Sequence, residues 1–232
     1  MKRLLVCLLA LLLALNGLCA FAETENHLTV GTTTALSGNF FTDMWGSNTA
    51  DMDVRALIHG CNMVEWSYAM GAFRLNSAVV REVTTADDNG NRVYTITLND
   101  GLRYSDGSKI TAWDYAFSIL LSAAPEMKAI GAATTGADYI LGINDYKNYE
   151  YDAADPQPNV LSGVRVLSSN KLAITVRKAY LPFFYEMALL NYVPYPISEI
   201  APGCKLADDG EGVYICNSAK DAEEPLFTAE LL

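Results

Sequence analysis

The stretch from Arg92 to Leu98 reads Arg-Val-Tyr-Thr-Ile-Thr-Leu, and it is the part of the sequence from which the fold can be worked out. Every second residue from Tyr94 to Leu98 is large and apolar, and alternate side chains of a strand share one face. Residues 79–84 are also rich in strand-forming types, and the Asn89-Gly90 pair between the two runs favours the positive φ of a tight turn. We therefore expect a half-buried antiparallel hairpin.

The residues after this hairpin predict two turns and a buried helix. The turns are Asn99-Asp100-Gly101 and Ser105-Asp106-Gly107, and Thr111 then lies three residues before Asp114. This spacing is typical of a capping box, with Asp in place of the usual Glu. The helix should end before Pro125. Its apolar stripe has helical spacing and is interpreted as core: Trp113, Ala116, Phe117, Leu120 and Leu121.

Three further segments complete the expected fold. Residues 163–167 and 171–176 predict a second hairpin, Pro182 can open a short helix over 183–190, and residues 28–30 resemble a short first strand. Strands and helices in this order indicate a mixed α+β fold (mixed α/β content) rather than a doubly wound sheet.

The amino-terminal residues 1–22 have the features of a signal peptide. A basic start precedes an apolar run over 4–15, and Ala20-Phe21-Ala22 fits a cleavage site, which would leave Glu23 as the mature terminus. Two alternatives are a membrane anchor, for which the run is short, and a lipid anchor at Cys19, before which a bulky Leu stands where a small residue is expected.

Export would place three cysteines in an oxidising or redox-neutral space. Cys204 and Cys216 flank a turn-rich stretch with two glycines, and the preferred interpretation is a disulfide between them. The alternatives are two buried thiols or, with no His nearby, a metal site. Cys61 is interpreted as a small core residue.

The composition excludes several classes of function. The chain has 232 residues, 51% of them hydrophobic, and a net charge of −11. It should fold around a core, and its acidity argues against binding nucleic acid or an acidic membrane.

The sequence offers no catalytic motif, so no catalytic residue, metal or cofactor is predicted. Its only histidines are His27 and His59, and it lacks a metalloprotease motif, a phosphate-binding loop and a nucleophile elbow. Asp208, Asp209 and Glu211 could contact calcium, but the twelve-residue loop spacing is absent, so a solvated acidic turn is the alternative.

Residues 94–98 and 101–118 together resemble the signature stretch of the oligopeptide- and dipeptide-binding proteins of ABC importers. The most specific part is Ser105-Asp106-Gly107-Ser108-Lys109-Ile110-Thr111-Ala112-Trp113-Asp114-Tyr115, and the resemblance extends over residues 27–200. It implies a periplasmic-binding-protein-like fold of type II, in which two lobes close over a ligand.

The chain is less than half as long as members of this family, so we expect an N-terminal fragment or a truncated gene product. The resemblance then implies part of lobe I and a small extra subdomain, with lobe II missing. The expected domains are residues 1–22 (signal peptide), 23–49 (first segment of lobe I), 50–160 (small extra subdomain) and 161–232 (return to lobe I).

The function that the resemblance implies is extracytoplasmic binding of peptides for delivery to an ABC permease. The protein would be non-enzymatic, periplasmic or associated with the cell surface, not integral to the membrane, and a monomer when full length. Within the family, a nickel chelate, an oligosaccharide or a signalling peptide could replace nutrient peptides. From other classes, a secreted hydrolase lacks its motifs and an adhesion fragment lacks an exposed repeat surface.

The candidate ligand site follows the expected first strand. A protein that accepts varied peptides must hold their common backbone, and an extended segment can do so by strand addition. The resemblance also places this stretch where the first lobe meets peptide. Gly38 would allow close approach, and short polar groups and aromatic walls would flank it; the alternative is that Phe40 and Phe41 are core residues. The candidate residues are Ser37, Gly38, Asn39, Phe40, Phe41 and Trp45.

Overall fold

The computed structural model describes residues 28–46, 48–134, 137–150, 152, 154 and 157–217. The chain forms two units, residues 1–35 and residues 36–232. The predicted signal peptide, residues 1–22, lies outside the described residues.

The first unit does not contain the expected strand at residues 28–30. These residues are extended but unassigned to any strand, and the Leu28 and Val30 side chains are exposed. A strand is stabilised by its ladder and by the burial of one face, and this three-residue stretch has neither in the part of the chain that the structure describes. The prediction of a strand here was wrong.

The second unit is built on a four-stranded antiparallel sheet in the order β3-β4-β6-β5. The two predicted hairpins are confirmed, because β3 (Val80–Asp88) pairs with β4 (Asn91–Leu98) and β5 (Val164–Ser168) pairs with β6 (Lys171–Val176). Asn89 and Gly90 have φ values of 55° and 88°, as a tight hairpin turn requires.

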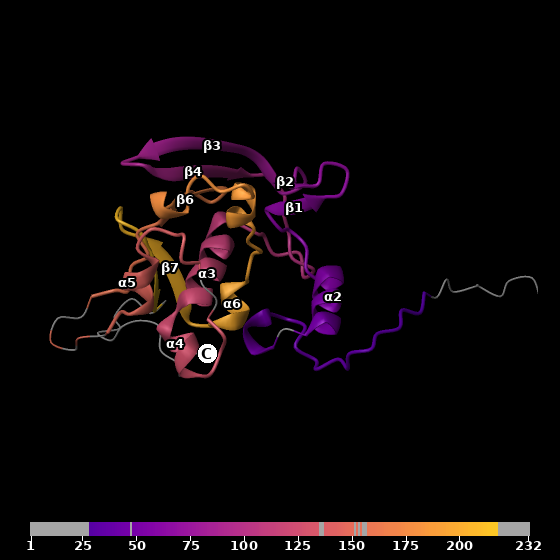
Figure 1. Cartoon of the computed structure of the whole chain (residues 1–232). Helices are drawn as coiled ribbons and strands as arrows, with labels where there is room; N and C mark the ends of the chain where they lie inside the picture. Colours follow the sequence, from indigo (N-terminus) through magenta and orange to yellow (C-terminus); the bar gives the residue numbers. More distant parts are fainter. Residues whose placement is uncertain are drawn as a thin grey trace, which may run out of the picture. The chain divides into compact units, whose positions relative to one another are not determined.

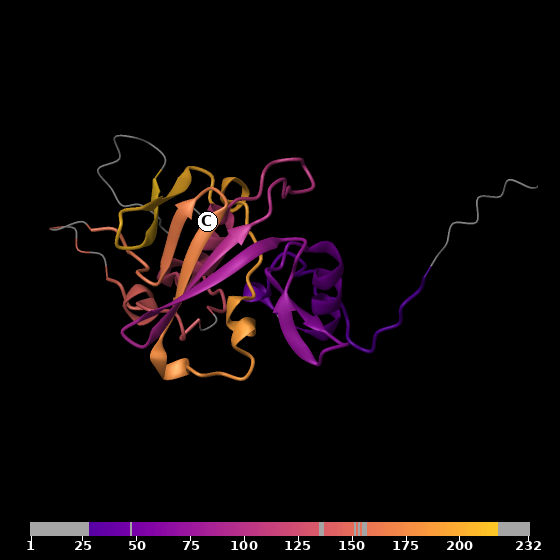
Figure 2. The ribbon, with the colours of Figure 1, turned by 90° about the horizontal axis from the view of Figure 1, so that it is seen from above.

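One face of the sheet packs on α3 (Ala112–Ala123), which lies against the sheet in Figures 1 and 2. Tyr94, Ile96 and Leu98 project from β4 into this core, as their alternation predicts. The helix contributes the other layer. Its buried side chains include four of the five residues of the predicted stripe, Ala116, Phe117, Leu120 and Leu121.

The predicted capping box is present at the start of α3. The Thr111 backbone N–H and hydroxyl both donate to Oδ2 of Asp114, at 2.7 and 2.8 Å. Burial raises the pKa of Asp114 most strongly, and these hydrogen bonds oppose the rise. The helix ends at Ala123, and Pro125 opens a separate short helix, α4 (Pro125–Ala129).

The remaining elements are short, and they connect or cover the sheet. The hairpin β1–β2 and the hairpin β7–β8 each form a separate two-stranded sheet. Their bounds are β1 (Val64–Ser67), β2 (Ala72–Leu75), β7 (Cys204–Asp208) and β8 (Val213–Asn217); the helices are η1 (Asp43–Trp45), α2 (Thr49–Ile58), α5 (Ile143–Lys147), η2 (Lys178–Tyr180), η3 (Glu186–Leu190) and α6 (Ile197–Ile200).

The register of β7 and β8 contradicts the predicted disulfide between Cys204 and Cys216. Cys204 is opposite Asn217, and Cys216 is opposite Lys205. Directly opposed residues share a face, so the two cysteines, one position out of register, point to opposite faces of the hairpin. Both are thiols, and a disulfide would require their Cβ atoms to face each other.

One other prediction needs correction. The helix expected over 183–190 is only the five-residue 3₁₀ helix η3, because Tyr185 leaves helical geometry and packs on Phe73 of β2, with ring centroids 5.6 Å apart. The expected division into residues 23–49, 50–160 and 161–232 stays a prediction; the sheet draws strands from both of the last two segments, since β4 pairs directly with β6.

Candidate functional site

The candidate site begins with three polar side chains on one face of α2 and at its end. Asp51, Arg55 and His59 are spaced four residues apart, so they form one stripe along the helix. The helix starts there because Asn48 is its N-cap, and the Asn48 side-chain oxygen accepts the Asp51 N–H at 2.9 Å. All three side chains of the stripe bind the segment of residues 37–46 that precedes the helix.

Asp51 holds the start of this segment. Its carboxylate accepts the Ser37 N–H at 2.9 Å and the Ser37 hydroxyl, and the Asn48 amide donates to it at 2.9 Å. The side chain is fully buried. The Ser37 hydroxyl is the largest cause that lowers the pKa of Asp51, and Arg55 contributes a smaller charge effect. Asp51 is thus an anion held by neutral donors.

Arg55 holds the middle of the segment through carbonyl oxygens. Its Nη1 donates to the carbonyls of Asn39 at 2.6 Å, Gly46 at 3.3 Å and Thr42 at 3.4 Å. One guanidinium nitrogen therefore holds three carbonyl groups of this segment close together. We call residues 37–46 and the three α2-stripe side chains the α2 clasp.

His59 completes the α2 clasp and begins an aromatic contact. Its Nε2 lies 2.8 Å from the Phe40 carbonyl, which can only accept, so Nε2 carries the proton. The next side chain, Phe41, packs its ring edgewise on His59, with ring centroids 5.9 Å apart, and packs on Tyr195 in a tilted arrangement, with centroids 5.5 Å apart. The Tyr195 hydroxyl donates to the Thr42 hydroxyl at 3.2 Å. The clasp therefore fixes Phe41 against the loop that contains Tyr195.

Four cavities meet around this aromatic contact. Three of them are lined by Phe41, and their volumes are about 680, 480 and 360 Å³. A fourth, of about 280 Å³, lies beside Tyr139, Tyr192 and Tyr195. Sizes of this order, with aromatic walls and a few polar groups, are typical of small-molecule and peptide sites.

The two largest cavities have a mixed polar lining. Arg55, Asn62 and Asn191 contribute to the cavity of about 480 Å³, while Arg103 and Glu199 contribute to the cavity of about 680 Å³. His59 and Tyr195 line both. Burial raises the pKa of Tyr195, so its hydroxyl stays protonated and available for hydrogen bonds at neutral pH.

The structure separates the predicted ligand residues into two groups. Phe41 and Trp45 are each 47% exposed and line cavities. Ser37, Gly38, Asn39 and Phe40 line none of the four cavities. The α2 clasp instead occupies main-chain groups that strand addition would offer to a ligand, namely the Ser37 N–H and the carbonyls of Asn39 and Phe40.

Sequence reasoning missed the α2 stripe and the loop of Tyr195. The four-residue spacing of Asp51, Arg55 and His59 was a signal for one polar helix face. No local signal marks Asn191 or Tyr195, which come to the site through the path of the chain after η3.

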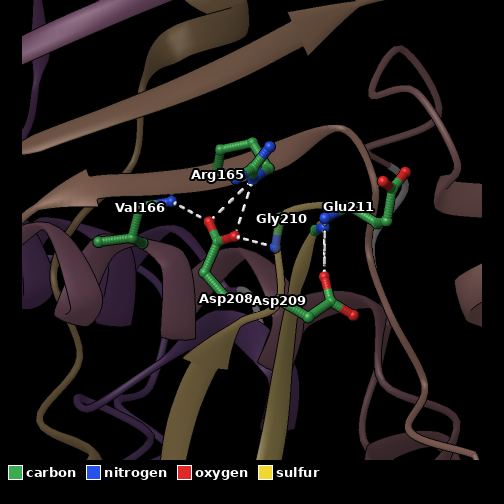
Figure 3. A network of polar contacts seen from close by, with 7 residues as sticks. Arg165, Val166, Asp208, Asp209, Gly210 and Glu211 are labelled. Carbon is green, nitrogen blue, oxygen red and sulfur yellow. Dashed lines mark hydrogen bonds and ion pairs between the residues drawn. The ribbon is translucent and has the colours of Figure 1, made fainter.

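The acidic turn between β7 and β8 is joined to β5 by hydrogen bonds of the Asp208 carboxylate, as Figure 3 shows. We call these Asp208 contacts the pin. Both Asp208 oxygens accept from Nε of Arg165 at 2.9 Å, and the N–H groups of Val166 and Gly210 add contacts at 2.8 and 3.0 Å. Burial acts to raise the pKa of Asp208, but the hydrogen bonds from Arg165, Gly210 and Val166 outweigh it, so the pKa is lowered. Asp209 caps its own turn by accepting the N–H of Glu211 at 2.8 Å.

The described part of the chain holds no group of three His, Cys, Asp or Glu side chains suited to a metal ion. None of its helices has the length and apolar character needed to span a bilayer.

Comparison with known proteins identifies the class. The model of the bacterial extracellular solute-binding proteins, family 5, middle region, matches residues 78–226, and the chain belongs to this family. These are non-enzymatic solute-binding proteins of ABC transporters. No curated protein matches the sequence.

Solved structures are similar to the chain at low sequence identity. The chain is similar to OppA of Listeria monocytogenes bound to peptide, with 19% identity, a TM-score of 0.50, and coverage of 74% of this chain and 35% of that one. Haemophilus influenzae OppA in complex with a peptide has 16% identity and a TM-score of 0.49, with coverage of 74% of this chain and 34% of that one. Lactococcal OppA with an endogenous peptide has 19% identity and a TM-score of 0.47, with coverage of 74% of this chain and 34% of that one. The chain therefore spans about a third of the length of these proteins.

Proposed function

We propose that this chain takes part in binding peptides outside the cytoplasmic membrane, for delivery to the permease of an ABC importer. Membership of the family supports the solute-binding role. The observation that carries the location is the meeting of three cavities at Phe41, which the α2 clasp holds in place.

The geometry favours a site made by side chains rather than by strand addition. The clasp uses main-chain groups of residues 37–40 internally, whereas Phe41, Trp45 and Tyr195 line the cavities with apolar surface. His59, Asn62 and Asn191 add groups that can bond to peptide amides. Peptide would lie across this surface, and a second lobe would close over it.

The chain by itself should bind peptide weakly. It spans about a third of the length of the solved relatives, so it is proposed to supply one wall of the site. A single wall neither excludes water nor offers the contacts that offset the entropy lost on binding. We expect a Kd weaker than about 1 µM, in contrast to a two-lobed protein.

Export and processing are part of the proposal. Cleavage after Ala22 would release a chain that begins at Glu23. Mass spectrometry of the protein secreted by a bacterial host should find that terminus. A lipid on Cys19 would instead place the protein at the membrane surface, and an intact Met1 would contradict export.

The binding test compares Phe41→Ala with Phe183→Ala in a chain of residues 23–232. Phe183→Ala is a matched control, because Phe41 and Phe183 are 47% and 45% exposed and, of the two, only Phe41 lines the cavities described above. Titration of a mixed tripeptide pool, followed by NMR line shifts, should show at least a fivefold loss of affinity for Phe41→Ala and none for Phe183→Ala. An equal loss of affinity in both variants would overturn the proposal. So would the absence of peptide binding in a chain that clearly binds a nickel chelate or an oligosaccharide.

A further inference from the structure

The cavity of about 360 Å³ differs from the others in its lining. Its floor is formed by Met44, Leu121 and Met127, which are at most 4% exposed. Its walls include Trp45 and Ile130, which are 47% and 38% exposed. Because its floor is buried and apolar and its walls are partly exposed, the pocket is open to solvent and can accept an apolar group.

The pocket has a fixed frame. Its two sides are η1 and α4, and the Ala133 N–H donates to the Met44 carbonyl at 2.7 Å, which ties the loop after α4 to η1. Thr42 caps η1 by accepting the Met44 N–H at 3.2 Å. Two methionines lie in the floor, and their unbranched, polarisable side chains can adapt to occupants of different shape.

One carboxylate stands in this apolar lining. Glu199, in α6, borders both this pocket and the cavity of about 680 Å³. It is exposed and makes no ion pair among the described residues. A carboxylate beside an apolar pocket favours a ligand in which a cation neighbours an apolar group. The net charge of the chain, −11, also favours a cationic ligand.

We propose that this pocket is a side-chain subsite for a peptide in which a bulky apolar side chain neighbours a cationic one. The apolar side chain enters between Trp45 and Ile130, and the cation lies at Glu199. The inference rests on the proposed function, and it adds the chemistry that the ligand presents to this wall.

The expected preferences follow from the two kinds of contact. An aromatic side chain offers about 150–250 Å² of apolar area for burial, so its replacement by Ala in the peptide should weaken binding at least tenfold. The contact with Glu199 is exposed to water, so loss of the cation should weaken binding only about two- to fivefold.

The test uses three acetylated and amidated tetrapeptides, so that the lysine carries the sole charge. The sequences are Ala-Phe-Lys-Ala, Ala-Ala-Lys-Ala and Ala-Phe-Gln-Ala, titrated into the chain of residues 23–232. The first should bind most tightly. Glu199→Gln should remove the preference for lysine over glutamine while the preference for phenylalanine remains.

Ile130→Glu should remove the preference for phenylalanine, because it places a charge in the wall of the pocket. The matched control is Leu167→Glu on β5, where the leucine is 50% exposed and borders none of the four cavities. Circular dichroism melting should show both variants folded; if Ile130→Glu is unfolded, Ile130→Ala, with a smaller loss of the same preference, replaces it. Equal binding of all three peptides would overturn the subsite while the proposed function stands. If neither these peptides nor the mixed pool binds, both fail.

Discussion

The sheet with α3 and the α2 clasp are held together by different forces. In the sheet, backbone ladders join β3, β4, β6 and β5, and α3 buries apolar side chains such as Phe117 against them. In the clasp, three polar side chains hold an irregular backbone segment by hydrogen bonds. The comparison indicates that the scaffold is stabilised by many non-directional contacts, whereas the site depends on a few directional ones.

The largest effect should come from the core of the scaffold. Phe117→Ala removes a fully buried ring and should lower the free energy of unfolding by about 3–5 kcal/mol, because the cavity it leaves is only partly refilled. Phe184→Ala is the control: this ring is 88% exposed, and its loss should change stability by less than about 0.5 kcal/mol.

Urea denaturation followed by circular dichroism measures both variants. If Phe117→Ala prevents folding, Phe117→Leu gives a smaller loss on the same scale. Similar stability of the Phe117 and Phe184 variants would show that the α3 core is not the main source of stability.

A smaller effect should come from the pin between β5 and the β7–β8 hairpin. Asp208→Asn removes the charge that pairs with Arg165 and leaves the contacts in Figure 3 incomplete, so the free energy of unfolding should fall by about 1–3 kcal/mol. Glu211→Gln, at an exposed position of the same turn, should have no measurable effect. Equal denaturation midpoints for these two variants would assign no stabilising role to the pin.

The smallest global effect should come from the α2 clasp. Its few contacts lie outside the core, so Asp51→Asn should leave the unfolding midpoint nearly unchanged and increase amide hydrogen exchange in residues 37–46 at least tenfold. Asp53→Asn is the matched control, because Asp53 is exposed on the same helix. Uniform exchange in both variants would contradict a locally held site.

The same clasp gives a pH dependence with a defined sign. Because the pKa of Asp51 lies below its ordinary value of 3.8, its contribution is complete above that pH and is lost as the pH falls through the folded-state value. The protection factors of residues 37–46, which correct for the slower intrinsic exchange at acidic pH, should therefore fall below about pH 4 before the sheet unfolds. Protection that persists until global acid unfolding would show that the carboxylate charge of Asp51 is not needed.

The scaffold could be predicted from sequence because its signals are local. The alternation in β4, the Asn89-Gly90 turn and the Thr111–Asp114 box each act within a few residues, and all three are present in the structure. The site could be predicted only in part. Phe41 and Trp45 line cavities, but a lone aromatic has the same sequence signature whether it lines a cavity or a core.

Two of the incorrect predictions share one cause. Cys204 and Cys216 have a spacing compatible with a disulfide, yet a single residue of register places them on opposite faces of the hairpin. Residues 28–30 have strand-forming composition but no neighbouring strand in the described chain. In both cases the outcome depends on pairing with another part of the chain, which composition does not encode.

The sequence alone determined the two hairpins of the sheet, the capped helix and the resemblance to peptide-binding proteins, because periodicity and turn chemistry are properties of neighbouring residues. Only the tertiary structure decided that Arg55 binds three carbonyls of the segment before α2, that Tyr195 contacts Phe41, and that Glu199 borders an apolar pocket. These contacts join residues up to about 150 positions apart, as the Tyr195–Thr42 hydrogen bond does, and their geometry is set by how the whole core packs.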